Sequence, residues 1–357
     1  MILQESNLTV RLAPESPCYN RVMNLFNKKN NKKTEQQKVE ERREEVLAQG
    51  RKFKYPLQWT KYRVVGNTIL IAAIVIAIIV TSGWLALYQF GMTDEMLFRV
   101  TKIVPVAVAN VDGENVKFSD YLMFYRSSII SIERQSGQVD NEGSFDALRL
   151  QYKRAALNES EEYAFATKLA KEHGITVTSE EVATEFKRHL SIGGVERSEE
   201  AFMKIVKENF GLDKDEYERM LYLTLVKAKV EAEIDHHASE IATKVESLLA
   251  ANGGDYAAVA NALGTEIQYQ ETGGMVSNQN IDGGRASEAF KLEPGQQSGR
   301  FVSMNGDGYY FVKLIKKTDN EVNFVSIKVP FTKFAADFSA LREAGKIQEY
   351  INITTNE

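Results

Sequence analysis

Cysteine occurs only once in the sequence, at Cys18, so the rest of the chain can form no disulfide and has no thiol chemistry. Histidine is also scarce, with four in 357 residues. Two of these, His236 and His237, are adjacent, and neighbouring side chains on a helix point about 100° apart. No third ligand cluster accompanies them, and no glycine-rich phosphate-binding motif is present. We therefore expect neither a metal site nor a cofactor.

An excess of positive charge is lacking outside the first 67 residues. That segment holds 14 Lys and Arg against 7 Asp and Glu, whereas the remaining 290 residues hold 30 against 42. A nucleic-acid interface needs a clustered basic face, which the large acidic part does not offer. Nucleic acid is therefore excluded as an expected partner.

Charge is absent altogether from residues 64–93. The core of this run, residues 66–88, has 23 residues, or about 34 Å of helix, enough to cross a hydrocarbon layer of about 30 Å. The polar segment before it is too long for a cleavable signal peptide, and no cleavage pattern of small residues follows. We predict an uncleaved transmembrane anchor. Because basic residues precede it, the N-terminus is expected in the cytoplasm and the C-terminal domain outside the cell membrane, in a single-pass topology.

Residues 1–63 are rich in Asn, Gln, Lys and Glu and poor in apolar side chains. Such a segment cannot bury enough surface to fold alone, so we expect a basic cytoplasmic tail that is largely disordered. The composition of residues 34–49 is compatible with a solvated helix. The basic stretch beside the membrane either binds anionic lipid headgroups or only fixes the topology, and both alternatives stay open.

Beyond the anchor, residues that favour the first position of a helix recur along the chain. Thr178 and Glu181 have the spacing of a capping box, in which each side chain accepts a hydrogen bond from the other residue's backbone. Ser198 and Asp213 each precede an apolar pattern of helical period, and Asn158 is expected to begin a further helix. A mostly helical region is therefore predicted here.

Three segments of this region resemble the N-terminal chaperone module of SurA- and PrsA-type foldases. They are ANVDGENVKFSDY, AFATKLAKEHGITVTSEEVATEF and ENFGLDKDEYERMLYLTLVKAKV, in that order along the chain. The resemblance implies a helical chaperone module over residues 100–235. It also implies that a C-terminal helix, expected within residues 332–357, packs back on that module.

Four later segments resemble successive blocks of a parvulin-type peptidyl-prolyl isomerase domain. They are ATKVESLLAANGGDYAAVANAL, ETGGMV, EAFKLEPGQQSG and GDGYYFVKLIKK. The resemblance implies a small α/β domain over residues 236–331, so the fold class expected for the whole chain is α+β. The opening strand of such a domain is replaced by a helical pattern. A strand of suitable character, VNFVSIKVPF, follows the last block instead, and if it fills the vacant sheet edge the domain is effectively permuted.

The residues that resemblance assigns to the isomerase pocket depart from the active pattern. Ser326 and Tyr310 stand where the family has histidines. Phe290 lies in the third block, at a position that the family pattern assigns to the pocket. In active members of the family, a Met and a Phe at fixed positions before this block contact the proline ring. The corresponding positions in this sequence are Ile281 and Arg285. Because a guanidinium is a poor floor for a proline pocket, we expect the domain to be weakly active or inactive.

The resemblance implies a membrane-anchored extracytoplasmic chaperone that binds unfolded or partly folded exported polypeptides without ATP. Its expected partners are those polypeptides and the lipid bilayer. Two alternatives remain: an active parvulin-type prolyl cis-trans isomerase with a rebuilt pocket, and a scaffold protein of the cell envelope.

Overall fold

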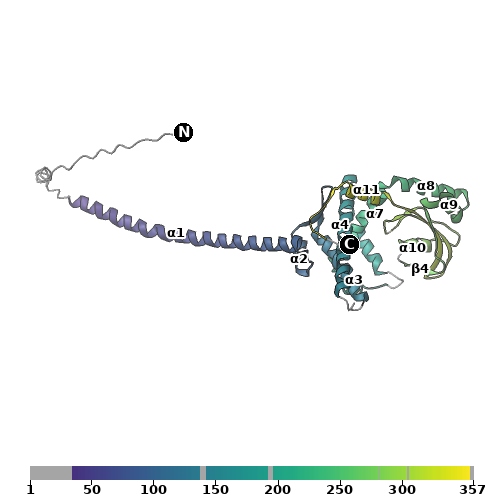
Figure 1. Cartoon of the computed structure of the whole chain (residues 1–357), viewed down its shortest axis with the longest axis horizontal. Helices are drawn as coiled ribbons and strands as arrows, with labels where there is room; N and C mark the ends of the chain where they lie inside the picture. Colours follow the sequence, from purple (N-terminus) through teal and green to yellow (C-terminus); the bar gives the residue numbers. More distant parts are fainter. Residues whose placement is uncertain (1–33, 137–141, 192–195, 281, 304, 354–357) are drawn as a thin grey trace, which may run out of the picture. The chain divides into compact units, whose positions relative to one another are not determined.

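The structure is a computed structural model that describes residues 34–136, 142–191, 196–280, 282–303 and 305–353 (Figure 1). Cys18 and Ile281 lie outside these residues. The chain divides into two compact units, Met1–Ile79 and Val80–Glu357, which are described separately. The chain is an α+β protein, as the sequence predicts.

The N-terminal unit is helical over its whole described length. Helix α1 spans Glu35–Trp84 and continues as a short π-helix, Leu85–Gln89. The solvated helix with which the composition of residues 34–49 is compatible forms the first part of α1, and the helix continues through the rest of the tail, where the composition favours disorder. Strong helix formers and charges of opposite sign at helical spacing favour this helix. Within this helix, Tyr62–Gln89 is long and apolar enough to cross a membrane by length and composition.

The second unit begins with a bundle of helices that packs around one apolar core. Buried side chains of this core include Leu122, Leu157 and Val230. The contacts between α3 and α4 and between α4 and α7 hold the bundle together. Its helices are α2 (Glu95–Ile103), α3 (Phe118–Ser136), α4 (Glu142–His173), α5 (Ser179–Leu190), α6 (Glu199–Phe210) and α7 (Lys214–Ile234).

Local capping residues set several of these helix ends. The Thr178–Glu181 capping box is formed at the start of α5, and the Ser198 side chain accepts a hydrogen bond from Ala201 N at the start of α6. Asp213 and Glu216 form a second capping box before α7. The predicted start at Asn158 is wrong, because α4 runs through it without a break.

A three-stranded sheet covers one end of the bundle and joins the two ends of the second unit. Strands β1 (Ala107–Val111) and β2 (Glu114–Lys117) form a hairpin whose turn places Asp112 and Gly113 at positive φ. Strand β8 (Ile347–Glu349) pairs antiparallel with β1. Strand β8 is not predicted by the sequence, because three residues are too few to show an alternating pattern.

Helix α11 (Lys333–Glu343) packs on the helical bundle just before β8. The Phe334 and Phe338 rings lie 5.1 and 5.8 Å, centre to centre, from the ring of Phe165 in α4. Ile351 and Ile353, beyond β8, are buried in the same core. The bundle core is therefore built from both ends of the second unit.

The segment between α7 and α11 forms a second sheet with the order β3-β7-β6-β5, and β4 also pairs with β7. Strand β7 lies in the interior of this sheet, so the expectation that it fills an edge is wrong. Its strands are β3 (Gln268–Glu271), β4 (Val276–Ser277), β5 (Phe301–Val302), β6 (Gly308–Lys317) and β7 (Glu321–Pro330).

Alternate residues of the central strands build two separate cores on the two faces of the sheet. Phe311 and Ile327 pack against α8 (His236–Ala251) and α9 (Tyr256–Leu263), which is followed by a 3-10 turn, Gly264–Glu266. Val312 and Phe324 pack on the opposite face against α10 (Arg285–Phe290). Up to the register shift after Leu314, side chains of even number in β6 and their even-numbered partners in β7 therefore share the face of α10.

Asp235 joins this second sheet to the helical bundle. It is 2% exposed and lies between α7 and α8. Its carboxylate accepts hydrogen bonds from the backbone N–H groups of Ala238, Thr332 and Lys333, at 2.9, 2.7 and 3.0 Å. One side chain thus caps α8 and holds the chain between β7 and α11.

Candidate functional site

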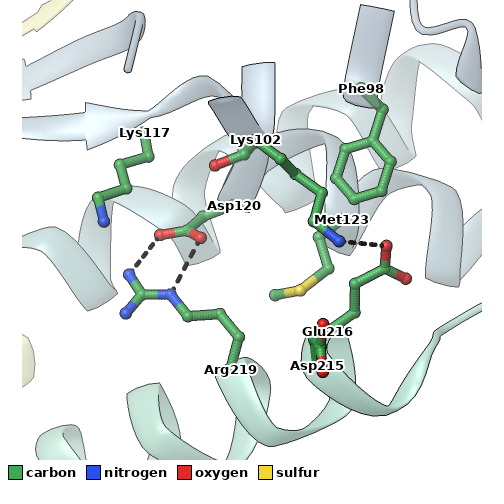
Figure 2. Close-up of a pocket in the computed structure, with 9 residues that line it drawn as sticks. Phe98, Lys102, Lys117, Asp120, Met123, Asp215, Glu216 and Arg219 are labelled. Carbon is green, nitrogen blue, oxygen red and sulfur yellow. Dashed lines mark hydrogen bonds and ion pairs between the residues drawn. The ribbon is translucent and has the colours of Figure 1, made fainter. Parts of the chain in front are cut away.

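A cleft of about 240 Å³ opens in the helical bundle between α2, α3 and α7 (Figure 2). All of its lining side chains come from the segment between the anchor and the second sheet. They are Phe98, Lys102, Lys117, Ser119, Asp120, Met123, Asp215, Glu216 and Arg219.

The wall of the cleft combines an apolar part with fixed ion pairs. Phe98 and Met123 are 2% and 3% exposed and belong to the bundle core. Arg219 donates two hydrogen bonds to Asp120, at 3.2 and 2.8 Å, and Lys102 Nζ lies 3.2 Å from Glu216. A ligand in this cleft meets apolar surface and charges of both signs.

Two further charges of opposite sign at the cleft are free for a ligand. Lys117 at the end of β2 and Asp215 in the first turn of α7 are both exposed. Within the described part of the chain, neither side chain forms an ion pair. Backbone carbonyls, backbone N–H groups and charged side chains of an extended peptide are all chemically suited to such a pair.

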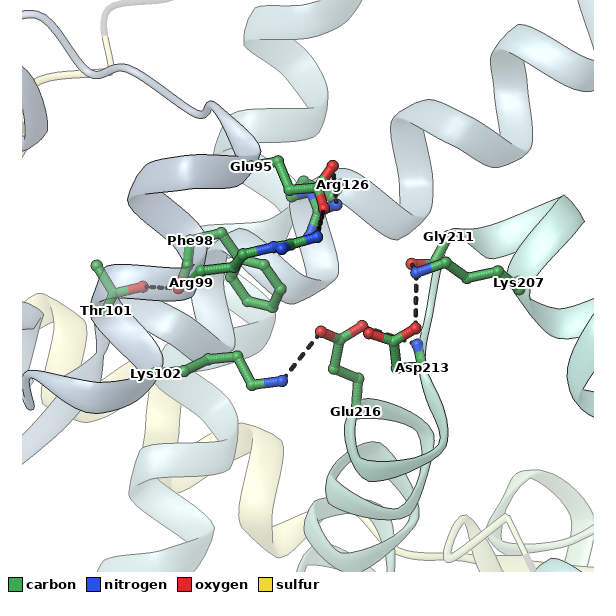
Figure 3. A network of polar contacts seen from close by, with 10 residues as sticks. All are labelled: Glu95, Phe98, Arg99, Thr101, Lys102, Arg126, Lys207, Gly211, Asp213 and Glu216. Atoms are coloured by element: carbon green, nitrogen blue, oxygen red, sulfur yellow. Dashed lines mark hydrogen bonds and ion pairs between the residues drawn. The ribbon is translucent and has the colours of Figure 1, made fainter.

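The cationic side chains of Arg126 and Lys102 contact the ring of Phe98 and so help to hold α2 in position (Figure 3). The Arg126 guanidinium carbon lies 4.5 Å from the centre of the Phe98 ring, and Lys102 Nζ lies 5.6 Å from it. Cations at such distances are attracted to the face of an aromatic ring. The cleft wall on the α2 side is therefore held from α3 as well as by α2 itself.

Beside this contact, the capping box of α7 is tied to α6. Lys207 donates a hydrogen bond to Asp213 at 2.7 Å, which lowers the pKa of that carboxyl from its ordinary value. Asp213 N donates to Glu216 Oε2 at 2.9 Å, while Glu216 also holds Lys102 (Figure 3). The start of α7 is thereby linked to α2 on one side and α6 on the other.

The second candidate site is the face of the second sheet that packs against α10. Four of the five pocket residues predicted from the sequence lie on this face or on α10. Arg285 and Phe290 are the two ends of α10, and Tyr310 and Ser326 lie on β6 and β7. Phe290 packs against the core of that face. Ile281 lies outside the described residues.

Tyr310 is only 5% exposed, and its neighbours are charged groups together with the ring of Phe301, which is stacked on it at 6.1 Å, centre to centre. The Arg285 guanidinium carbon lies 5.3 Å from the centre of its ring, and Lys328 Nζ lies 5.8 Å from it. The Tyr310 hydroxyl donates to Asp307 Oδ2 at 3.2 Å, and the same carboxylate forms an ion pair with Lys328. Burial and the negative charge of Asp307 raise the pKa of Tyr310 to about 12.

The other polar groups of this face are also engaged. Arg285 donates to Gln270 Oε1 and to the Asp282 carbonyl, and Ser326 Oγ donates to the Gln270 carbonyl at 3.4 Å. Ser326 is 1% exposed and pairs with Val312 in the register of β6 and β7. The arrangement is a polar network in which the Tyr310 hydroxyl already has a partner, while Asp307 Oδ1 is buried without a hydrogen bond among the described residues.

Within the described residues, no group of three or more His, Cys, Asp or Glu side chains is arranged to hold a metal ion.

Residues 60–231 match the family described as the SurA-like N-terminal domain. The matched segment includes every residue that lines the cleft and supports a SurA-like chaperone module. The match ends in α7, so the second sheet lies outside it. No curated protein matches the sequence.

Sequence reasoning did not identify the cleft. Phe98 and Met123 are apolar residues of amphipathic helices, and in the sequence they cannot be told from core residues that touch no cleft. Lys117 and Asp215 are single charges beside a turn and a helix start, where charges are common. Only the packing of α2 on α3 and α7 brings the four side chains together.

Proposed function

We propose that the chain is a membrane-anchored chaperone that binds unfolded or partly folded exported polypeptides, without ATP, outside the cytoplasm. The observation that supports this most is the position of the cleft, which lies wholly inside the segment that matches the SurA-like N-terminal domain. A cleft with an apolar wall and charges of both signs is expected to bind many peptide sequences with low affinity rather than one sequence with high affinity.

The proposed topology follows the distribution of charge and apolar residues. One helix, Tyr62–Gln89, is consistent with a single membrane anchor, and the basic residues that precede it favour a cytoplasmic N-terminus. The helical module is assigned to residues 100–235, the parvulin-like domain to residues 236–331 and the returning C-terminal segment to residues 332–357. We also assign to the basic tail an attraction for anionic headgroups, which rests on its charge alone.

Ser119→Trp should weaken binding of an unfolded polypeptide at least about fivefold, because an indole at this lining position fills much of the cleft. The measurement is the fluorescence anisotropy of a labelled, permanently unfolded polypeptide titrated with the full chain in detergent micelles. Suppression of client aggregation should fall in parallel.

The matched control is Ser247→Trp, which adds the same side chain at an exposed position of α8 and should bind as the unchanged chain does. Urea unfolding of both variants verifies that they are folded. Equal affinity of the two folded variants would move the client site away from the cleft. Absence of binding by the unchanged chain would favour the scaffold alternative.

We further propose that the parvulin-like domain has little or no isomerase activity. Isomerisation must lower a barrier of about 18 to 20 kcal/mol, which requires a site shaped to favour the twisted amide. Beside the Tyr310 ring, Arg285 and Lys328 are charged and already have partners. Arg285 binds Gln270, and Lys328 binds Asp307. A proline ring placed there would have to displace Arg285 or Lys328 from its partners.

The full chain should therefore accelerate cis-trans exchange of a proline peptide by less than about twofold, and Tyr310→Ala should leave that rate unchanged. The rate is measured by exchange NMR on the peptide, with a known active parvulin as the positive control. Parvulin-like turnover that drops in Tyr310→Ala would establish the enzyme alternative instead.

A further inference from the structure

Helix α2 has an outer face that is apolar and exposed. Met96, Val100 and Ile103 are 77%, 44% and 84% exposed. At 3.6 residues per turn, these three positions fall within one arc of about 60°. No charged residue of α2 lies inside that arc, and Arg99 and Glu95 lie about 40° and about 80° beyond the same edge of it. The helix therefore presents a narrow apolar stripe, which we call the outer stripe.

The opposite face of α2 fixes the direction in which the outer stripe points. Phe98 and Thr101 are 2% and 3% exposed, and the Thr101 hydroxyl donates to the Phe98 carbonyl at 2.8 Å. Arg126 holds the Phe98 ring from α3 (Figure 3). Rotation of α2 to bury the outer stripe would expose this core contact, so the stripe stays outside the bundle.

The outer stripe lies close to the end of the apolar span. Five residues lie between Gln89, the last residue of the span, and Glu95, the first of α2, so six steps along the chain limit the distance between them to about 20 Å. The connection is itself apolar and exposed at Phe90 and Met92, at 71% and 46%. Lys153 of α4 donates a hydrogen bond to the Gly91 carbonyl at 3.1 Å and holds this connection on the bundle.

The last turn of the span is built into the bundle rather than joined to it by a free linker. Leu87 is 6% exposed within the bundle core. The Tyr88 hydroxyl donates to the Ala107 carbonyl at 2.6 Å, and its ring meets Phe118 edge-on at 5.8 Å. These contacts prevent the bundle from moving far from the end of the span.

We infer that the outer stripe and the Phe90–Met92 connection lie in the outer interfacial layer of the lipid bilayer. The inference rests on the proposed membrane anchor. An exposed apolar arc with charges along one side suits the boundary between headgroups and acyl chains, where the helix axis lies in the membrane plane. Continuity with the span selects the bilayer over a client or a second copy of the chain as the occupant of this face.

If the outer stripe lies in the lipid interface, the cleft on the other side of α2 lies close to the membrane surface. The inner face of α2 contributes Phe98 and Lys102 to the cleft wall, while the outer stripe faces lipid. The cleft is then held at the membrane surface, one helix diameter away from the bilayer. A polypeptide that has just crossed the membrane would reach it before it could diffuse away.

The test uses the full chain with Cys18→Ser and one new cysteine at a time, labelled with an environment-sensitive nitrobenzoxadiazole probe. The labelled chain is reconstituted in phosphatidylcholine–phosphatidylglycerol vesicles that contain lipids carrying a quencher at a known depth. The test positions are Ile103→Cys and Met96→Cys. Ile76→Cys reports on the span, and Lys244→Cys, exposed on α8, reports on solvent.

The Ile103 and Met96 probes should lose about half of their emission to shallow quenchers, the Ile76 probe should be quenched by deep ones, and the Lys244 probe should be unaffected. Quenching at Ile76 without quenching at either α2 position overturns the inference and leaves the anchor intact. Absence of quenching at Ile76 overturns the anchor itself. An α2 signal that changes only on addition of an unfolded polypeptide, or only with increasing protein density, would assign the face to a client or to a second copy.

Discussion

Asp235→Ala should lower the free energy of unfolding of the second unit by about 3 to 5 kcal/mol. The carboxylate is buried and accepts three backbone hydrogen bonds, two of which come from the chain between β7 and α11. Removing it takes the acceptor away from the buried N–H of Ala238 and from the N–H groups of Thr332 and Lys333, whose residues are exposed. A hydrogen bond to a charged group contributes about 1.5 to 3 kcal/mol. Urea unfolding of the full chain in micelles, followed by near-ultraviolet circular dichroism, measures the change.

Asp255→Ala is the matched control, because Asp255 caps α9 through a single hydrogen bond to Ala258 N, at 3.0 Å, from an exposed position. Its loss should cost only about 1 kcal/mol. A similar small effect for both variants would show that Asp235 acts as an ordinary helix cap and does not hold the sheet to the bundle.

The same carboxylate predicts a dependence of stability on pH. Burial acts to raise the pKa of Asp235, but the N–H groups of Ala238, Lys333 and Thr332 outweigh it and lower that pKa from its ordinary value. The folded state then binds this proton less readily than the unfolded state does. The stabilisation is present above the unfolded-state pKa and is lost as the pH falls through the folded-state pKa. Asp235→Ala should therefore show a weaker acid destabilisation than the unchanged chain.

Arg342→Met should destabilise the second unit by about 3 kcal/mol at pH 8, because it leaves a buried carboxylate without its counter-charge. Arg342 in α11 donates to Glu161 Oε2 at 2.7 Å, and the Glu161 side chain is fully buried in α4. The other oxygen of Glu161 has no hydrogen-bond partner among the described residues. Urea unfolding at two pH values measures the effect.

The destabilisation should shrink at pH 5. Burial raises the pKa of Glu161 to about 7, even though the Arg342 charge acts to lower it. A carboxyl whose folded-state pKa is raised binds its proton more tightly when folded, so stability falls as the pH rises from about 4.5 to about 7. Without Arg342 the pKa rises further, and the neutral acid present at pH 5 tolerates the loss of its partner.

Two further variants separate this explanation from simple loss of packing. Lys333→Met, on the same helix, removes an exposed ion pair with Asp337 and should cost less than about 0.5 kcal/mol. Glu161→Gln added to Arg342→Met should recover stability at pH 8, because it removes the unpaired charge. A double variant no more stable than Arg342→Met at pH 8 would contradict the electrostatic explanation.

The sequence predicted those helix starts that depend on neighbours within three residues. Thr178, Ser198 and Asp213 each bond within their own first turn, so the signal is wholly local. Asn158 has the same residue type but a different partner: its amide oxygen accepts hydrogen bonds from Arg342, at 3.3 Å. That contact joins positions 184 residues apart, so local reasoning took Asn158 for a cap when it lies inside α4.

The strand order of the second sheet and the position of the cleft depend on contacts between distant parts of the chain, so the sequence did not predict them. The alternation in β7 indicated a strand, but only its pairing with both β3 and β6 reveals that it is an interior strand. Aligned blocks put Arg285 and Tyr310 in one region, whereas the ion pair of Lys328 with Asp307 depends on register across the sheet. The cleft is formed by residues of three helices and of β2, and no single segment of the sequence has a pattern that predicts it.

The pairing of β1 with β8 has a consequence for how the chain is made. Ala109 pairs with Glu349, Tyr350 N donates to the Val108 carbonyl at 2.9 Å, and Ile351 and Ile353 fill the bundle core. The ribosome releases β8, Ile351 and Ile353 only after the entire second sheet has been synthesised. Until then, the edge of β1 is unpaired and part of the bundle core is unfilled. Non-local closure of this kind is slow and exposes surface that attracts other chains. The newborn protein therefore passes through a stage in which it resembles the unfolded chains that it is proposed to bind, and its bundle closes only after β8 and Ile353 have been translated.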